Sequence, residues 1–248
     1  MLFNLNEDFS EANDVAAKNP AKLEQLKQLW FMQASKYKVF PVDSSLQLRL
    51  VTPRPQITEP RTKYIYYPGT GEVEADSAVD VRNRSYSISA DVEIGKDGAK
   101  GVLIAHGGTF AGYSFFINKD QKLQFSHNYV AINEYKVIST EKVPTGKVAL
   151  RMEFKKTGPP DFAKGKGSPG TVTLYFNDKA VGSGEIPVTC PLGYSLSGDG
   201  LSVGRDTLSA VSLDYMGSTF PFTGGVIRRV TVDIGNDQHP TPKPPDRD

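Results

Sequence analysis

The sequence predicts a mainly β protein, an antiparallel sandwich of two sheets preceded by an N-terminal helix. Three observations support this prediction. Apolar and polar residues alternate along several short segments, no helical pattern separates those segments, and 23 glycines with 17 prolines supply many turns. Including minor edges, we expect about a dozen strands without helical crossovers, which favours antiparallel pairing.

Residues 101–127 form the centre of the predicted sandwich. Val102–Ala105 is an apolar run of strand formers, and a glycine loop separates it from a second strand that reaches Ile117. In a third strand Gln124 and Ser126 lie opposite the apolar residues, because side chains on a strand alternate between its two faces. We therefore expect strands that are buried on one face and solvated on the other.

The same alternation predicts the other strands. The clearest covers residues 85–94, where every second residue from Tyr86 to Ile94 is apolar. The last covers 226–234 and places these residues on one face: Val226, Val230, Val232 and Ile234. The remaining strands are predicted at 64–67, 129–138, 148–154 and 172–176.

The chain is predicted to have four parts. Residues 1–40 contain a short strand at Leu2–Leu5 and a helix at about 20–38, where Asn19 should cap the helix and Pro20 suits its first position. Residues 41–61 hold four prolines and form a linker. The sandwich covers 62–234, and the proline-rich segment 235–248 is expected to be a disordered tail.

Composition excludes several classes of partner. The net charge is +1 with no sustained basic run, so a nucleic-acid partner has little electrostatic support. Neither a secretory leader nor an apolar span of membrane-crossing length is found, so no membrane partner is expected, and the compartment is left open. A single cysteine excludes an internal disulfide framework.

Four local features contain residues that could carry chemistry. Residues 165–170 match G-x-G-x-x-G, but a strand follows them instead of a helix, which indicates a loop between strands. Cys190 is interpreted as a small apolar filler, and residues 83–85 are a formal glycosylation sequon. Three acidic residues in glycine- and serine-rich loops are candidate calcium ligands, although solvated turns are the alternative: Asp199, Asp206 and Asp214.

Two parts of the chain resemble the sulfatase family. Leu2-Phe3-Asn4-Leu5-Asn6-Glu7-Asp8-Phe9-Ser10-Glu11-Ala12-Asn13-Asp14-Val15-Ala16 is similar to the closing segment of the sulfatase catalytic fold, with Phe9 where proline is common. About 65–234 resembles the C-terminal extension of a bacterial arylsulfatase branch. The residues that carry this second resemblance are Tyr66-Tyr67-Pro68-Gly69, Asn83-Arg84-Ser85-Tyr86, Gly101-Val102-Leu103, Arg151-Met152-Glu153-Phe154, Gly170-Thr171-Val172-Thr173-Leu174-Tyr175, Val203-Gly204-Arg205-Asp206-Thr207 and Phe220-Pro221-Phe222-Thr223-Gly224.

The resemblance implies a concanavalin A-like sandwich that serves as an accessory domain. Sulfatase chemistry requires Cys/Ser-x-Pro-x-Arg, whose first residue becomes formylglycine, beside a metal that is usually calcium. Cys190-Pro191-Leu192-Gly193-Tyr194 does not match that motif, so no catalytic residue and no cofactor are expected in this chain. The implied partner is a sulfatase catalytic domain, which the sandwich would support, and the chain alone should hydrolyse no sulfate ester.

The alternative function is a glycan-binding module, since concanavalin A-like sandwiches often bind sugars. Such binding needs exposed aromatic rings to stack on sugar faces. The candidates are Tyr113, Tyr129, Tyr135 and Tyr215, together with His106 at a strand end before two glycines. Each tyrosine is equally compatible with the core or its rim, and for His106 a half-buried position at the strand end is favoured over a place in a pocket. A sandwich-fold glycosidase or lyase is a third possibility.

Overall fold

The computed structural model describes residues 1–42, 59, 61–195 and 198–240 of the chain. It divides into two compact units, Met1–Arg49 and Leu50–Asp248. The predicted linker lies almost entirely outside the described residues. Within the described part, no helix combines the length and the apolar character needed to cross a membrane.

The first unit is built on one helix, α1 (Pro20–Lys36), which confirms the predicted helix. Asn19 does not cap it as predicted, because its side-chain amide donates backwards to the Val15 carbonyl. The predicted strand at Leu2–Leu5 is also wrong. The Leu2 carbonyl accepts from the Val15 N–H, and the segment runs through turns into a short 3₁₀ helix, η1 (Ala16–Lys18).

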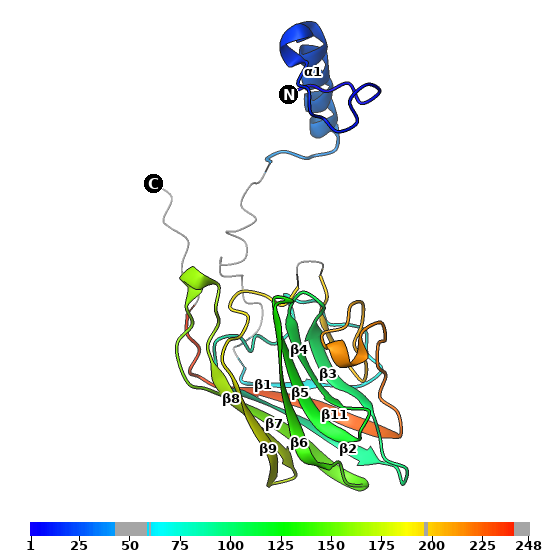
Figure 1. Cartoon of the computed structure of the whole chain (residues 1–248), viewed down its shortest axis with the longest axis vertical. Helices are drawn as coiled ribbons and strands as arrows, with labels where there is room; N and C mark the ends of the chain where they lie inside the picture. Colours follow the sequence, from blue (N-terminus) through cyan, green and yellow to red (C-terminus); the bar gives the residue numbers. More distant parts are fainter. Residues whose placement is uncertain (43–58, 60, 196–197, 241–248) are drawn as a thin grey trace. The chain divides into compact units, whose positions relative to one another are not determined.

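The second unit confirms the predicted sandwich of two antiparallel sheets (Figure 1). The six-stranded sheet has the order β1-β11-β2-β7-β8-β9, and the five-stranded sheet has the order β10-β3-β4-β5-β6. The first comprises β1 (Lys63–Tyr66), β11 (Gly225–Ile234), β2 (Tyr86–Ile94), β7 (Gly146–Lys156), β8 (Gly170–Phe176) and β9 (Lys179–Ile186). The second comprises β10 (Leu201–Val203), β3 (Gly101–Gly107), β4 (Gly112–Ile117), β5 (Lys122–Tyr129) and β6 (Asn133–Lys142).

The main core lies between the two sheets. In β2 every second residue from Tyr86 to Ile94 is buried, as the alternation predicts. Leu150 and Met152 of β7 and Phe115 of β4 are completely buried in the same cluster. Burying each such side chain contributes about 1.5–3 kcal/mol, which makes this layer the main source of stability.

Two predicted strands need correction. The strand predicted at 129–138 is divided, because Val130 and Ala131 adopt positive φ angles and a tight turn joins β5 to β6. In β11 the register with β2 shifts between Ile227 and Arg229. The bulge turns Ile227 into the core and leaves Val226 60% exposed, so the predicted common face of β11 begins one residue too early.

β9 was not predicted because it lacks alternation. Gly182 and Gly184 occupy positions where the other sheet approaches closely. A Cβ atom on Gly182 would lie 2.8 Å from the Ile138 carbonyl oxygen, and one on Gly184 would lie 2.9 Å from a Val137 methyl. The glycines therefore bring β9 against β6 at the side of the sandwich.

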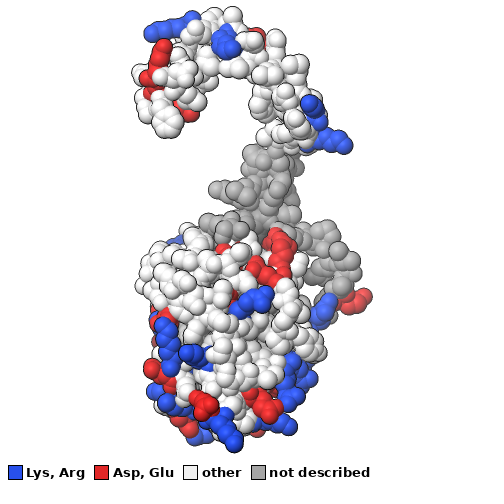
Figure 2. Space-filling view, turned by 90° about the vertical axis from the view of Figure 1, so that its right-hand side faces the viewer, with Lys and Arg blue, Asp and Glu red and all other residues white. Residues whose placement is uncertain are grey.

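Part of the predicted tail is held against the sandwich. Asp237 accepts hydrogen bonds from the backbone N–H and the hydroxyl of Ser85, and His239 N–H donates to the Asn83 carbonyl. Residues 241–248 lie outside the described residues. On the face shown in Figure 2, basic and acidic side chains of the sandwich are interspersed.

Candidate functional site

The five-stranded sheet is covered on its outer face as well as its inner one. Every residue of β3 and of β4 is buried, which corrects the expectation that these strands are solvated on one side. The cover is the segment 204–223, called the strap below, which lies against β3 and β4 (orange in Figure 1). A continuous apolar run is typical of a strand that is buried on both faces.

A second apolar cluster holds the strap in place. Val211, Tyr215 and Phe220 of the strap pack on three outward-facing side chains of the sheet, Val102, Ala105 and Phe116. The rings of Tyr215 and Phe220 stack with their centroids 5.2 Å apart, and the Phe116 ring meets Tyr215 edge-on at 5.2 Å. These contacts fix the position of the strap relative to β4.

A buried polar group forms a second anchor. Asp206 Oδ2 accepts hydrogen bonds from the Val211 N–H at 2.9 Å and the Tyr215 hydroxyl at 2.7 Å. The same hydroxyl lies 2.8 Å from Ser114 Oγ of β4. Burial raises the pKa of Asp206 to about 6, although both donors favour the carboxylate.

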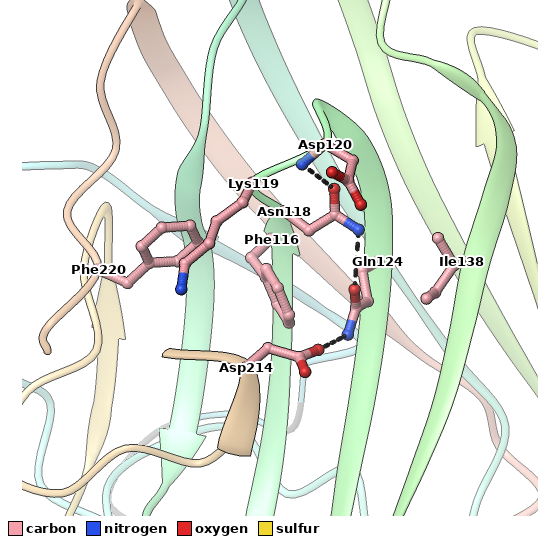
Figure 3. Close-up of a pocket in the computed structure, with 8 residues that line it drawn as sticks. All are labelled: Phe116, Asn118, Lys119, Asp120, Gln124, Ile138, Asp214 and Phe220. Carbon is pink, nitrogen blue, oxygen red and sulfur yellow. Dashed lines mark hydrogen bonds between the residues drawn. The ribbon is translucent and has the colours of Figure 1, made fainter. Parts of the chain in front are cut away.

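The uncovered part of the outer face forms a pocket where the strap ends. Its volume is about 260 Å³, and it lies between β4, β5 and β6 and the edge of the strap (Figure 3). It is lined by Phe116, Asn118, Lys119, Asp120, Gln124, Ile138, Asp214 and Phe220. Gln124 is on this face because Leu123 and Phe125, its neighbours on β5, point into the core.

A chain of hydrogen bonds crosses the floor of the pocket. The Asn118 amide donates to Gln124 Oε1 at 3.1 Å, and Gln124 Nε2 donates to Asp214 Oδ2 at 2.5 Å (Figure 3). Lys136 Nζ approaches the other Asp214 oxygen at 2.6 Å and also lies 3.3 Å from Glu134. The Asp214 carboxylate at one end of this hydrogen-bond network therefore fixes the orientation of both amides.

Asp214 is ionised although the pocket is only partly open to water. Burial opposes its charge, but the hydrogen bonds from Lys136 and Gln124 outweigh that effect and lower its pKa. The pKa of Lys136 is raised, since its contacts with Asp214 and Glu134 outweigh the cost of burial. The pocket thus holds a fixed carboxylate acceptor beside amide groups, with Phe220 and Ile138 as apolar walls.

The structure separates the predicted aromatic residues from this pocket. His106 and Tyr113 lie on the inner side of the five-stranded sheet with their rings 5.8 Å apart, and Tyr215 is buried between the strap, to which it belongs, and the sheet. These three offer no open ring face. Tyr129 and Tyr135 are half-buried and pack against the main core from β5 and β6.

The three predicted calcium ligands do not converge. Asp199 accepts from Ser195 and Ser209, Asp206 binds Tyr215, and Asp214 binds Lys136 in the pocket. Among the described residues, no three His, Cys, Asp or Glu side chains come together as a metal site would require. Only Asp214 belongs to the pocket, where it takes the role of a hydrogen-bond acceptor.

Sequence reasoning missed most of the pocket. The alternation predicts a solvated face for Gln124 and Ser126, yet both are buried, and Gln124 Nε2 donates to Ser126 Oγ at 3.2 Å. The signal was an amide and a hydroxyl within the alternating strand, next to a consecutive apolar run on β4. The contribution of Asp214 and Phe220 depends on the path of the strap, which no periodic pattern predicts.

The sequon does not correspond to a glycosylation site in this fold. Asn83 is 4% exposed, and its amide donates to the Pro191 carbonyl while its oxygen accepts from the Ser168 N–H. A buried amide with both ends bonded cannot accept a bulky surface sugar.

Cys190 is expected to be chemically inert in the folded protein. It is fully buried, and burial raises the pKa of its thiol to about 11, so the reactive thiolate is scarce at neutral pH. A thiol reagent should label the native protein far more slowly than the same protein in 6 M guanidinium. Equal labelling rates, followed by mass spectrometry, would contradict this assignment.

Comparisons with known proteins add the following findings. No family model matches the chain, and no curated protein matches it. Among solved structures it is similar to the Ruminococcus gnavus IT-sialidase CBM40, at 14% identity and a TM-score of 0.45, with 70% of this chain and 94% of that chain covered. A structure of that domain bound to alpha2,3 sialyllactose gives the same values.

Two further similar structures are animal proteins. The Caenorhabditis elegans galectin LEC-6 is 8% identical with a TM-score of 0.35, and the match covers 68% of this chain and 95% of the galectin. Domains LG4-5 of the mouse laminin alpha1 chain are 12% identical with a TM-score of 0.36, covering 71% of this chain and 40% of that one. These structural neighbours are lectin-like and carbohydrate-binding jelly-roll domains.

Proposed function

We propose that the sandwich is a carbohydrate-binding module that holds its ligand in the pocket between β4–β6 and the strap. The observation that carries the proposal is the pocket itself, in which a chain of amide and carboxylate groups lies between apolar walls. The structural neighbours named above do not carry it, given TM-scores of 0.45 or less.

The chemistry of the pocket suits a sugar. A sugar ring presents hydroxyl groups, which both donate and accept hydrogen bonds, and C–H faces, which are apolar. Asp214 offers an acceptor, the Asn118 amide and Lys119 offer donors, and Phe220 with Ile138 can contact the ring faces. Small-molecule sites commonly combine apolar walls with a few polar groups in this way.

The test is a glycan array followed by calorimetry on any sugar retained. Asp214→Ala is expected to weaken binding about tenfold or more, since a charged hydrogen-bond acceptor is lost. Asp91→Ala is a matched control on the other sheet. Asp91 and Asp214 have side chains 37% and 38% exposed, and each lies 2.6 Å from a basic group.

Two outcomes would contradict the proposal. The first is that the parent protein retains no glycan on the array. A glycan that binds Asp214→Ala and Asp91→Ala equally well would place the ligand elsewhere on the molecule.

A supporting role beside a sulfatase catalytic domain is the second candidate function, which rests on the sequence resemblance. The observation that favours it is the surface of the helical unit. Ala34 is the only buried residue of α1, whereas Trp30, Phe31 and Met32 are 49–63% exposed. Exposed apolar surface of this kind is typical of protein–protein contacts. A sulfatase motif in frame upstream of Met1 would support this role, and its absence from the gene would contradict it.

A further inference from the structure

We propose that the pocket selects an uncharged sugar and discriminates against sugars that carry a carboxylate. This inference rests on the proposed function and adds the chemical class of the ligand. The charges that line the pocket, their existing partners and the size of the cavity support it.

The charges around the pocket leave an excess of negative charge. Of the eight described residues that line it, two are carboxylates, Asp120 and Asp214, and one is an ammonium, Lys119; none is an arginine. Just outside, Lys136 is balanced by Glu134. An anionic sugar would therefore enter a site that already carries surplus negative charge.

The cation nearest the floor is already engaged. Lys136 lies 2.6 Å from Asp214 and 3.3 Å from Glu134, and these contacts raise its pKa. A ligand carboxylate that approached Lys136 would have to compete with two protein carboxylates. An arginine fork, which recognises carboxylates through two parallel hydrogen bonds, is not among the lining residues.

The groups that remain suit hydroxyls. The ionised Asp214 side chain can only accept hydrogen bonds, so it favours a donor such as a sugar hydroxyl and disfavours a second acceptor. Gln124 cannot rotate to compensate. Its amide donates to Asp214 and Ser126 while its oxygen accepts from Asn118.

The size of the pocket limits the ligand to a short one. At about 260 Å³ it is slightly smaller than the range of roughly 300–1,000 Å³ that is usual for small-molecule sites. This volume fits one sugar ring better than an extended chain. We therefore infer that a single uncharged ring fills the pocket.

Matched pairs of methyl glycosides test this inference on the full chain. Methyl galactoside, glucoside and mannoside are each compared with the corresponding uronate, in which a carboxylate replaces the hydroxymethyl group. Binding is followed by NMR titration of the Gln124 and Asn118 side-chain amides. The uncharged member of the pair that binds should do so at least about fivefold more tightly at low salt. The ratio should narrow in 0.5 M NaCl, because salt screens charge repulsion.

The variant Asp120→Asn should also reduce the difference in affinity between the uncharged glycoside and its uronate. It removes one exposed carboxylate from the rim of the pocket and keeps the size of the side chain. A uronate that binds as tightly as its uncharged partner, with shifts at Gln124 and Asn118, would overturn the inference and leave the proposed function intact. No shift at these amides with any glycoside would instead count against the proposed function.

Discussion

Phe115→Ala is expected to reduce the free energy of unfolding by about 3–5 kcal/mol. Phe115 is completely buried at the centre of β4, where it pairs with Phe125 of β5 and faces the six-stranded sheet. Removing the ring forfeits its burial and leaves a cavity that the close-packed sheets cannot fill. A domain of this size is stabilised by about 5–15 kcal/mol in total, so the variant should lose a large share of its stability.

Urea denaturation followed by circular dichroism measures this loss. Ile132→Ala is the control, since Ile132 lies in the β5–β6 turn and is 71% exposed. The control should change stability by no more than about 0.5 kcal/mol. If the Phe115 variant unfolds at the same urea concentration as the parent, the sheets do not pack as described.

Lowering the pH from about 6.5 to about 4 is expected to destabilise the sandwich by several kcal/mol. Burial, together with the Arg82 charge nearby, lowers the pKa of His106 to about 4, and burial lowers that of His127 to the same value. The unfolded chain binds protons at both histidines near pH 6.5, whereas the folded protein resists until about pH 4. Each histidine therefore costs about 3 kcal/mol of stability across this window.

Asp206 acts in the opposite direction. The pKa of Asp206 is about 6 in the folded protein and 3.8 in the unfolded chain. Asp206 therefore adds stability that is fully present below about pH 3.8 and is lost as the pH rises to about 6. The loss of stability on acidification is thus smaller than the two histidines alone would produce. The sign of the net effect still follows the histidines, since there are two of them, whereas among the described residues Asp206 is the one carboxyl whose pKa is raised.

Denaturation curves at pH 7 and pH 4.5 measure the net change. In the parent protein the Cys190 N–H donates a hydrogen bond to His127 Nε2 at 3.2 Å. The variant His127→Gln keeps an acceptor for this N–H and removes the titrating group. Because Asp206 offsets part of the histidine effect, this variant should lose more than half of the net pH dependence. A parent protein equally stable at both pH values, with a variant that behaves the same way, would show that neither histidine is buried in its neutral form.

Local periodicity predicted β2, β7 and β8 because their side chains alternate between a buried face and a more exposed one. From Tyr86 to Ile94 the alternation is complete, and the sequence alone is sufficient. It is insufficient for β3 and β4, where a non-local segment buries the outer face. Val102–Ala105 and Phe115–Ile117 carry that information as consecutive apolar residues, but the sequence does not indicate which segment covers them.

The candidate site was less predictable for the same reason. It combines Gln124 from a strand with Asp214 and Phe220 from the strap, some 90 residues further along the chain. Aromatic residues were favoured as ligand contacts, yet His106, Tyr113 and Tyr215 serve packing instead. Their residue types suit a sugar site, but all three side chains are buried.

The separation of the strap into buried residues that attach it and exposed residues has a consequence for protein engineering. Its attachment depends on Asp206, Val211, Tyr215 and Phe220, whereas Leu213 and residues 216–219 are exposed. Residues 216–219 line a separate hollow beside Thr109 and Leu208, so variation there would not reach the pocket at Asp214. A library for new ligand preferences should instead vary Lys119, Asp120 and Ile138, which are exposed residues of the pocket lining that take no part in attaching the strap.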